Sequence, residues 1–253
     1  MTSPGRLLLV PAPLDFGCEP PAPLDRALPA ATLLAASKLT HWICESAKTT
    51  RAYLKRIAET HPLPVPLQQM EIAELPREVH KKGDHFGGFD AKPMLRAAIE
   101  GHDVGLVSEA GMPAVADPGS SVVRAAHELG LVVVALAGPS SLLLALAASG
   151  LNGQNFAFVG YLPQEPAART QRIRELEALA LRTKQTQLFI ETPYRNESLW
   201  GALLQALQPS TRLAVSSGLT LDAAMSRSDS AAHWRAKACP LSNTKPAVFA
   251  IGA

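Results

Sequence analysis

Short, continuous apolar runs separated by helical stretches constrain the fold of this 253-residue chain more than any other feature. A run that is apolar at every position, rather than at alternate positions, is typical of a strand covered on both faces of a parallel sheet. Eight such runs occur, at 7–11, 41–44, 104–108, 131–136, 156–161, 187–191, 212–216 and 247–251. Their alternation with helical segments predicts an α/β protein with a largely parallel sheet.

Three of the intervening helices have recognisable ends. Ser120 is positioned to cap a helix that ends at Gly130, and Ser140 to cap one that ends at Gly150. Residues 166–182 repeat apolar positions at helical spacing, which predicts an amphipathic helix. The chain turns from a strand into a new helix near Gly138–Pro139. We therefore expect two α/β domains, residues 1–138 and 139–253.

Composition excludes several classes of protein. With 47% hydrophobic and 18% charged residues, the chain is not intrinsically disordered. Its longest apolar runs are well short of the roughly 18 residues that span a bilayer, so no membrane helix is expected. Cys18, Cys44 and Cys239 form no CxxC pair, which argues against a disulfide framework or a metal centre. Together with an N-terminus that lacks a secretion signal, they predict a cytoplasmic protein.

The formal net charge is only +2, too small to indicate a nucleic-acid-binding protein by itself. A local patch can still bind nucleic acid, and basic residues gather between 169 and 184 and between 48 and 56. Glutamates interrupt the first group. Two readings stay open for these residues, contacts with phosphates or solvated helix faces.

Nucleotide phosphate motifs are missing from the sequence. No GxxxxGK[ST] motif occurs, and residues 83–88, Gly-Asp-His-Phe-Gly-Gly, have the wrong spacing for GxGxxG and follow no expected strand. A P-loop ATPase and a dinucleotide-binding enzyme are both disfavoured.

Three loops rich in small residues and proline follow expected strands, at residues 11–13, 108–119 and 137–141. Ligands of open α/β sheets bind beyond the carboxyl ends of strands, where these loops fall. Glycine and alanine there allow close approach of the backbone to a ligand. The structural alternative is that glycine and proline only terminate the strands.

These loops resemble the tetrapyrrole (corrin/porphyrin) methylase superfamily of S-adenosylmethionine-dependent enzymes. Residues 108–119 are similar to its Ser-Asp-Ala-Gly-Thr-Pro…Asp-Pro-Gly signature, with Glu109 and Met112 as replacements. Residues 138–151, 160–163 and 187–195 resemble further segments of the superfamily in the same order. Within it, the resemblance is greatest to enzymes that methylate the ribose 2′-hydroxyl of a cytidine in small-subunit ribosomal RNA.

The resemblance implies two α/β domains, with a mostly parallel sheet in the first, a mixed sheet in the second and S-adenosyl-L-methionine in the cleft between them. It also implies a homodimer that acts on rRNA or the small ribosomal subunit. The residues that match cofactor-contacting positions are Pro11, Ala110, Gly111, Met112, Val115, Ser140, Ser141, Ile190, Glu191, Pro246 and Ala247.

A hydroxyl acceptor benefits from a base near its proton, and Glu109, Asp117 and Glu45 are candidates by position. Each has a structural alternative, since Asp117 can simply turn its loop and either glutamate can pair with an arginine. Several residues depart from the superfamily pattern on the acceptor side, including the Gly-Asn pair of the first loop. Two alternatives therefore stay beside rRNA methylation: methylation of a tetrapyrrole or other small molecule, and a catalytically silent cofactor-binding paralogue.

Overall fold

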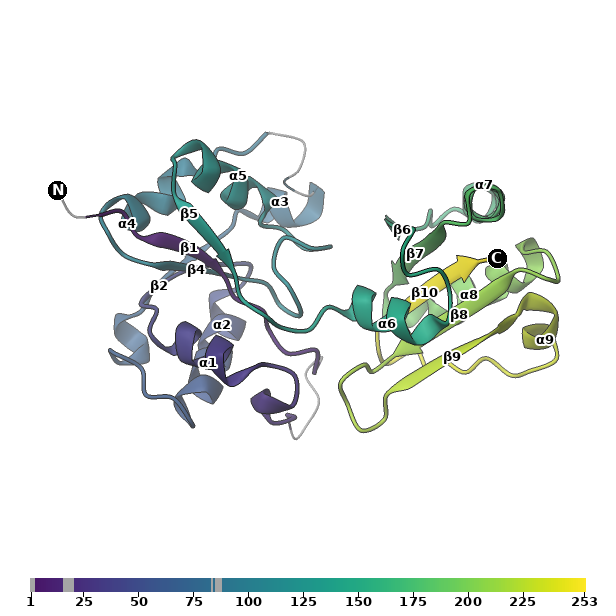
Figure 1. The fold of residues 1–253 in the computed structure, drawn as a ribbon, viewed down its shortest axis with the longest axis horizontal. Helices are drawn as coiled ribbons and strands as arrows, with labels where there is room; N and C mark the ends of the chain where they lie inside the picture. The colour runs from purple at the N-terminus through teal and green to yellow at the C-terminus, as the bar shows by residue number, and fades with distance from the viewer. Residues whose placement is uncertain (1–2, 16–20, 83, 85–87) are drawn as a thin grey trace. The chain divides into compact units, whose positions relative to one another are not determined.

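The computed structural model of the protein describes residues 3–15, 21–82, 84 and 88–253. The described chain forms two compact units, Met1–Pro139 and Ser140–Ala253. Each unit is built on one five-stranded sheet (Figure 1). Cys18 and most of the 83–88 segment lie outside the described residues, whereas Cys44 and Cys239 are both free thiols.

The sheet of the first unit is parallel throughout, with strand order β3-β2-β4-β1-β5. Its strands are β1 (Arg6–Leu9), β2 (His41–Cys44), β3 (Glu71–Glu74), β4 (Val104–Val107) and β5 (Val132–Ala135). Its helices are η1 (Leu24–Arg26), α1 (Ala30–Ser37), α2 (Ala47–Ala58), η2 (Leu67–Gln69), α3 (Arg77–Lys82), η3 (Lys92–Leu95), α4 (Arg96–Ile99) and α5 (Ser120–Glu128).

Two apolar cores lie on the two faces of this sheet. Leu33 of α1 and Leu54 of α2 pack in one core with Trp42 of β2. Leu95 of η3 and Val122 of α5 pack in the other core with residues of the strands, among them Leu106 of β4. Figure 1 shows α1 and α2 on one side of the sheet and α3, α4 and α5 on the other. Burial on both faces explains why these strands are continuously apolar.

Gly105, in the central strand β4, makes room for the largest side chain of the first core. A Cβ atom at this position would lie 2.7 Å from two carbons of the Trp42 indole ring. Trp42 is only 1% exposed and packs with the buried residues of the first core. The glycine therefore allows the buried tryptophan to approach the backbone of the neighbouring strand, where the two residues are paired.

The sheet of the second unit is mixed, with order β6-β7-β10-β8-β9, and only β6 and β7 are parallel neighbours. Its strands are β6 (Phe156–Tyr161), β7 (Thr186–Glu191), β8 (Arg212–Ser217), β9 (Met225–Ser230) and β10 (Ala247–Gly252). Its helices are α6 (Ser141–Ser149), α7 (Pro166–Thr183), η4 (Pro193–Arg195), α8 (Asn196–Ala206) and α9 (Ala231–Arg235).

Alternate residues of these strands pack in two different apolar cores. Phe189 of β7 and Phe249 of β10 stack at 5.7 Å and pack with residues of α7, α8 and α9. Leu188 and Val248, one position along, pack with Leu146 of α6. The predicted α/β class, the mostly parallel first sheet and the mixed second sheet are all confirmed.

Two strands were not predicted, and two predicted as buried are partly exposed. The missed strands β3 and β9 lie at sheet edges and are rich in polar residues, so they lack an apolar run. β5 and β6 are also edge strands, and their ends Val132 and Tyr161 are 60% and 55% exposed. A continuous apolar run thus marks a strand without showing that both of its faces are covered.

One predicted helix cap was also wrong. The N-cap of α5 is Gly119, and Ser120 is the first residue of the helix. Ser140 does occupy the N-cap position of α6, and Gly150 ends that helix in the left-handed conformation. Within the described residues, none of the helices is long and apolar enough to cross a membrane.

The contact between Gly105 and Trp42 predicts that Gly105→Ala destabilises the first unit. The added methyl group must displace a buried indole ring, so we expect a loss of about 1–3 kcal/mol in the free energy of unfolding, measured in urea. Gly88→Ala is the control, because a Cβ atom there has no neighbour within 4 Å. Equal stability of the two variants would contradict this account of the core.

Candidate active site

The first two loops singled out in the sequence are joined by backbone hydrogen bonds. The amide of Ala12 donates to the carbonyl of Gly111 at 2.8 Å, and the amide of Gly111 donates back to Ala12 at 3.0 Å. The hydroxyl of Tyr53 donates to the carbonyl of Pro11 at 2.9 Å. Because Tyr53 is buried, the pKa of its phenol is raised, which keeps this donor protonated.

The third loop packs against the first. A Cβ atom at Gly138 would lie 2.2 and 2.4 Å from Cγ and Cβ of Pro11, so only glycine allows this approach. The carbonyl of Ala137 accepts a hydrogen bond of 2.6 Å from Thr32. The loops that follow β1, β4 and β5 therefore meet at the carboxyl edge of the first sheet, where a ligand of an open α/β sheet binds.

The loop between β4 and α5 has an unusual backbone. Ala114 and Ala116 have φ angles of 63° and 66°, and Gly111 and Gly119 are also at positive φ. Left-handed conformations of alanine cost about 1–2 kcal/mol each and persist only where neighbouring contacts enforce them. Such conformations cluster at ligand-binding loops, and Val115 between the two alanines is 45% exposed.

Asp84 anchors the far end of this loop. Its buried carboxylate accepts hydrogen bonds from the amides of Gly119 and Ser121, both at 2.8 Å, and from the hydroxyls of Ser120 and Ser121, both at 2.7 Å. Burial alone would raise the pKa of Asp84, but these hydrogen bonds together hold it below its usual value. The side chain thus replaces the cap that the sequence assigned to Ser120.

The three candidate carboxylates form a group at the same edge. Glu45 follows β2, and its Oε1 accepts a 3.3 Å hydrogen bond from the amide of Glu109, which follows β4. Oε1 of Glu109 accepts a 2.7 Å hydrogen bond from the hydroxyl of Thr49. Burial raises the pKa of Asp117 to about 7, and the charges of Glu45 and Glu109 add to this rise, whereas a hydrogen bond from Ser108 opposes it.

Four predicted residues of the second unit also lie together. Ala247 at the beginning of β10 pairs with Glu191 at the end of β7, so Pro246 and Ile190 are at the same end of the sheet. Oε1 of the buried Glu191 accepts hydrogen bonds from Arg195 at 2.6 and 2.9 Å. Ser140 and Ser141 lie at the beginning of α6, outside this strand pair.

The basic residues in and just after α7 differ in exposure, and Arg174, Arg182 and Lys184 are exposed. Arg169 is buried, and Arg172 pairs with Glu175 at 3.3 Å. In the second basic group, Arg56 pairs with Asp15 at 2.6 Å. Arg169, Arg172 and Arg56 are thus engaged within the fold, and both readings stay open for the exposed basic residues.

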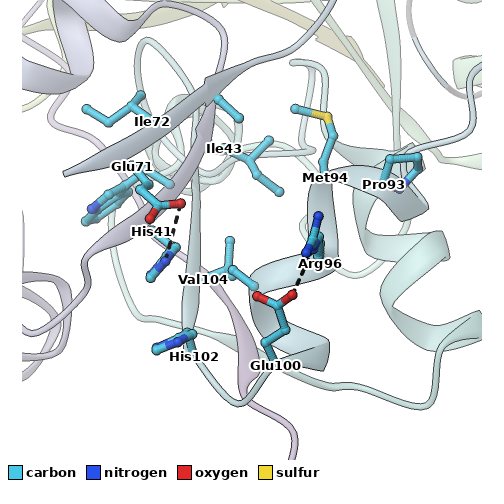
Figure 2. A pocket seen from close by; sticks show the side chains of 13 residues that line it. His41, Ile43, Glu71, Ile72, Pro93, Met94, Arg96, Glu100, His102 and Val104 are labelled. Atoms are coloured by element: carbon cyan, nitrogen blue, oxygen red, sulfur yellow. Dashed lines mark hydrogen bonds and ion pairs between the residues drawn. The ribbon is translucent and has the colours of Figure 1, made fainter. Parts of the chain in front are cut away.

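A hollow of about 630 Å³ lies elsewhere, around the amino ends of β2, β3 and β4. Figure 2 shows the His41 ring beside Glu71, at 3.6 Å, and Arg96 beside Glu100, at 2.8 Å. None of the cofactor-contacting or base residues predicted from the sequence lines this hollow. In the part of the chain that the structure describes, no three His, Cys, Asp or Glu side chains are placed to hold a metal ion.

Comparison with known proteins identifies relatives of this chain. The profile of the family described as Tetrapyrrole (Corrin/Porphyrin) Methylases matches residues 26–228. Two relatives are called ribosomal RNA small subunit methyltransferase I. The one from Mesorhizobium japonicum is 39% identical over 54% of this chain and 45% of the relative, and the one from Escherichia coli O157:H7 is 36% identical over 44% and 38%. The matched segments thus span less than half the length of these relatives.

The fold has a counterpart of known structure. The crystal structure of the methyltransferase CobJ superposes with a TM-score of 0.57 and covers 98% of this chain and 94% of its own. Its sequence is 17% identical to this chain, so the likeness is one of fold.

The network around Asp84 generates a prediction for the loop. Asp84→Asn removes a charged acceptor of four hydrogen bonds, so we expect unfolding of the first unit to become easier by about 2 kcal/mol or more. Faster hydrogen exchange at the amides of Gly119 and Ser121 should accompany this loss. Because the folded pKa is lowered, the difference from wild type should be present at neutral pH and shrink as Asp84 protonates in acid.

The control for this prediction is Asp90→Asn, since Asp90 is exposed and accepts one local hydrogen bond from Lys92. If Asp84→Asn leaves both the stability and the two exchange rates at the values of this control, Asp84 does not anchor the loop.

Proposed function

The chain belongs to the tetrapyrrole (corrin/porphyrin) methylase family, and on this premise we propose that it is an S-adenosylmethionine-dependent methyltransferase acting on a ribose 2′-hydroxyl of small-subunit ribosomal RNA. The observation that carries the proposal is the meeting of its three family loops at one sheet edge, through the Ala12–Gly111 hydrogen bonds and the Gly138–Pro11 contact. The RNA acceptor is inferred from relatives whose names state that substrate.

The side chains at this edge fit the methyl donor. S-adenosylmethionine supplies, when bound, an electrophilic methyl group on a sulfonium cation attached to adenosine, and it carries no phosphate. Glu45 and Glu109 offer negative charge to such a cation, and the exposed Val115 offers an apolar contact for a nucleoside. The residues that would hold the donor are Pro11, Ala110, Gly111, Met112 and Val115, together with Ser140, Ser141, Ile190, Glu191, Pro246 and Ala247 of the second unit.

Asp117 is the general base of the proposed reaction. A carboxylate that accepts the proton of the acceptor hydroxyl makes its oxygen a better nucleophile, and a base works best with a pKa near the working pH. Asp117 meets this condition, with a pKa raised to about 7. Glu45 and Glu109 act on it through their charge, and each accepts a hydrogen bond within the loops.

The assay that tests this proposal is transfer of labelled methyl groups to small ribosomal subunits from a strain that lacks the modification. We expect label in small-subunit RNA and, after nuclease digestion, in a single 2′-O-methylated nucleoside. Label found only in a small-molecule fraction would contradict the RNA acceptor. Tight binding of S-adenosylmethionine with no labelled product from any extract would contradict catalysis.

The raised pKa predicts how the rate depends on pH. Asp117 is protonated below about pH 7, so the wild-type rate should rise between pH 6 and pH 8. Asp117→Asn should lose about 100-fold or more of kcat and this pH dependence, while calorimetry still detects cofactor binding. Since a raised carboxyl pKa destabilises the folded state once the group is ionised, this variant should also be more stable than wild type at pH 8.

Glu109→Gln provides the matched control for the base. Removing this neighbouring negative charge should lower the pKa of Asp117 and move the midpoint of the pH–rate profile to lower pH. A profile whose midpoint is the same in wild type, Asp117→Asn and Glu109→Gln would exclude Asp117 as the titrating base.

A further inference from the structure

Two of the three tyrosines of the chain are exposed at one end of the second sheet, where β6 and β7 finish. Tyr161 is the last residue of β6 and is 55% exposed, and Tyr194, in η4 just after β7, is 72% exposed. β6 and β7 are parallel neighbours (Figure 1), and after a register shift Tyr161 pairs with Ile190. Tyr161 therefore lies at the carboxyl end of β6, and Tyr194 lies just beyond the carboxyl end of the adjacent strand β7.

The backbone of β6 directs Tyr161 out of the regular strand pattern. Gly160 has a φ angle of +73°, and the pairing with β7 shifts register between Phe158 and Tyr161. A shift of this kind turns a side chain away from the face that strict alternation would give it. The sequence thus exposes a large aromatic ring at the end of a strand, where a polar residue would suffice for solubility.

Tyr194 is held by a rigid turn. The amide of Arg195 donates to the carbonyl of Thr192 at 3.0 Å, and Pro193 fixes the φ angle between them. The guanidinium of Arg195, bound to the buried Glu191 at 2.6 Å, lies 5.8 Å from the centroid of the Tyr194 ring. The ring is therefore positioned beside a cation and still presents most of its surface to solvent.

A second cation belongs to the same end of the sheet. Lys245 precedes β10, and its carbonyl accepts a 2.8 Å hydrogen bond from Asn196 at the beginning of α8. The Lys245 ammonium lies near the turn after β8, 3.7 Å from where a Cβ atom of Gly218 would be. A lysine at this end of the sheet can contact a phosphate of an RNA chain that reaches past β10.

We propose that Tyr161 and Tyr194 form a stacking surface for unpaired nucleobases of the RNA acceptor, with Lys245, at the same end of the sheet but beside the turn after β8, available to a phosphate further along the strand of RNA. The inference rests on the proposed function and adds the part of the chain that recognises RNA. Stacking on aromatic rings needs little net positive charge, which suits a chain of net charge +2. The surface adjoins Ile190, Glu191 and Ala247, which we expect to contact the cofactor.

Binding of a short unstructured oligoribonucleotide that contains 2-aminopurine tests this surface without depending on catalysis. We expect the wild-type protein to quench the fluorescence of the probe. Tyr194→Ala and Tyr161→Ala should each weaken binding about 10-fold, because stacking of one base contributes about 1–3 kcal/mol. Tyr194→Trp should restore both binding and quenching, which a purely structural role of the phenol would not do.

Phe156→Ala is the matched control, since Phe156 is a partly exposed aromatic residue at the other end of β6. This variant should bind the probe like wild type, and all variants should bind S-adenosylmethionine with unchanged affinity. Probe affinity that is the same in the two tyrosine variants and this control would overturn the inference. So would tyrosine variants that lose affinity for S-adenosylmethionine but keep their affinity for the probe. Tyrosine-dependent binding of RNA without methyl transfer would support the surface and count against the proposed function alone.

Discussion

The pair of hydrogen bonds between Ala12 and Gly111 is the interaction on which the rest of the candidate site depends. It joins the loops after the neighbouring strands β1 and β4, and because β1 also neighbours β5, the loop after β1 contacts the loops after both. Such a position, where the strand order changes direction, is where open parallel sheets bind ligands. The absence of a side chain at Gly138 then brings the third loop against Pro11. The geometry of the site therefore follows from strand order as much as from the loop sequences.

Central strands could be predicted from the sequence because burial on both faces requires an apolar residue at every position, as in β4 and β10. The polar edge strands β3 and β9 could not, because pairing through the backbone on one side allows sequences as polar as Glu71–Glu74 and Met225–Ser230, whereas the edge strands β5 and β6 are apolar enough to be predicted. The same limit applies to the cap of α5. Asp84 stabilises that helix from 35 residues earlier in the chain, and no local pattern around Ser120 indicates a distant acceptor.

The candidate site was predictable at the level of loops and less so at the level of side chains. Glycine, proline and alanine after strands indicated all three loops, and resemblance supplied their chemistry. The choice among Glu45, Glu109 and Asp117 depends on burial and mutual distance, which the sequence does not contain. The two tyrosines were equally inaccessible to pattern reasoning, because their exposure depends on a register shift in β6 and on the turn after β7. Whether these residues contact cofactor and RNA stays a prediction.

An amide chemical-shift map recorded during titration with S-adenosylmethionine tests most directly whether the edge joined at Ala12 and Gly111 binds the methyl donor. The largest changes should fall in residues 10–13, 108–119 and 137–141, with a second set around Glu191 and Ala247. Changes confined to the hollow around His41 and Glu71, at the other end of the first sheet, would contradict this assignment. So would a titration that leaves the three loops unperturbed.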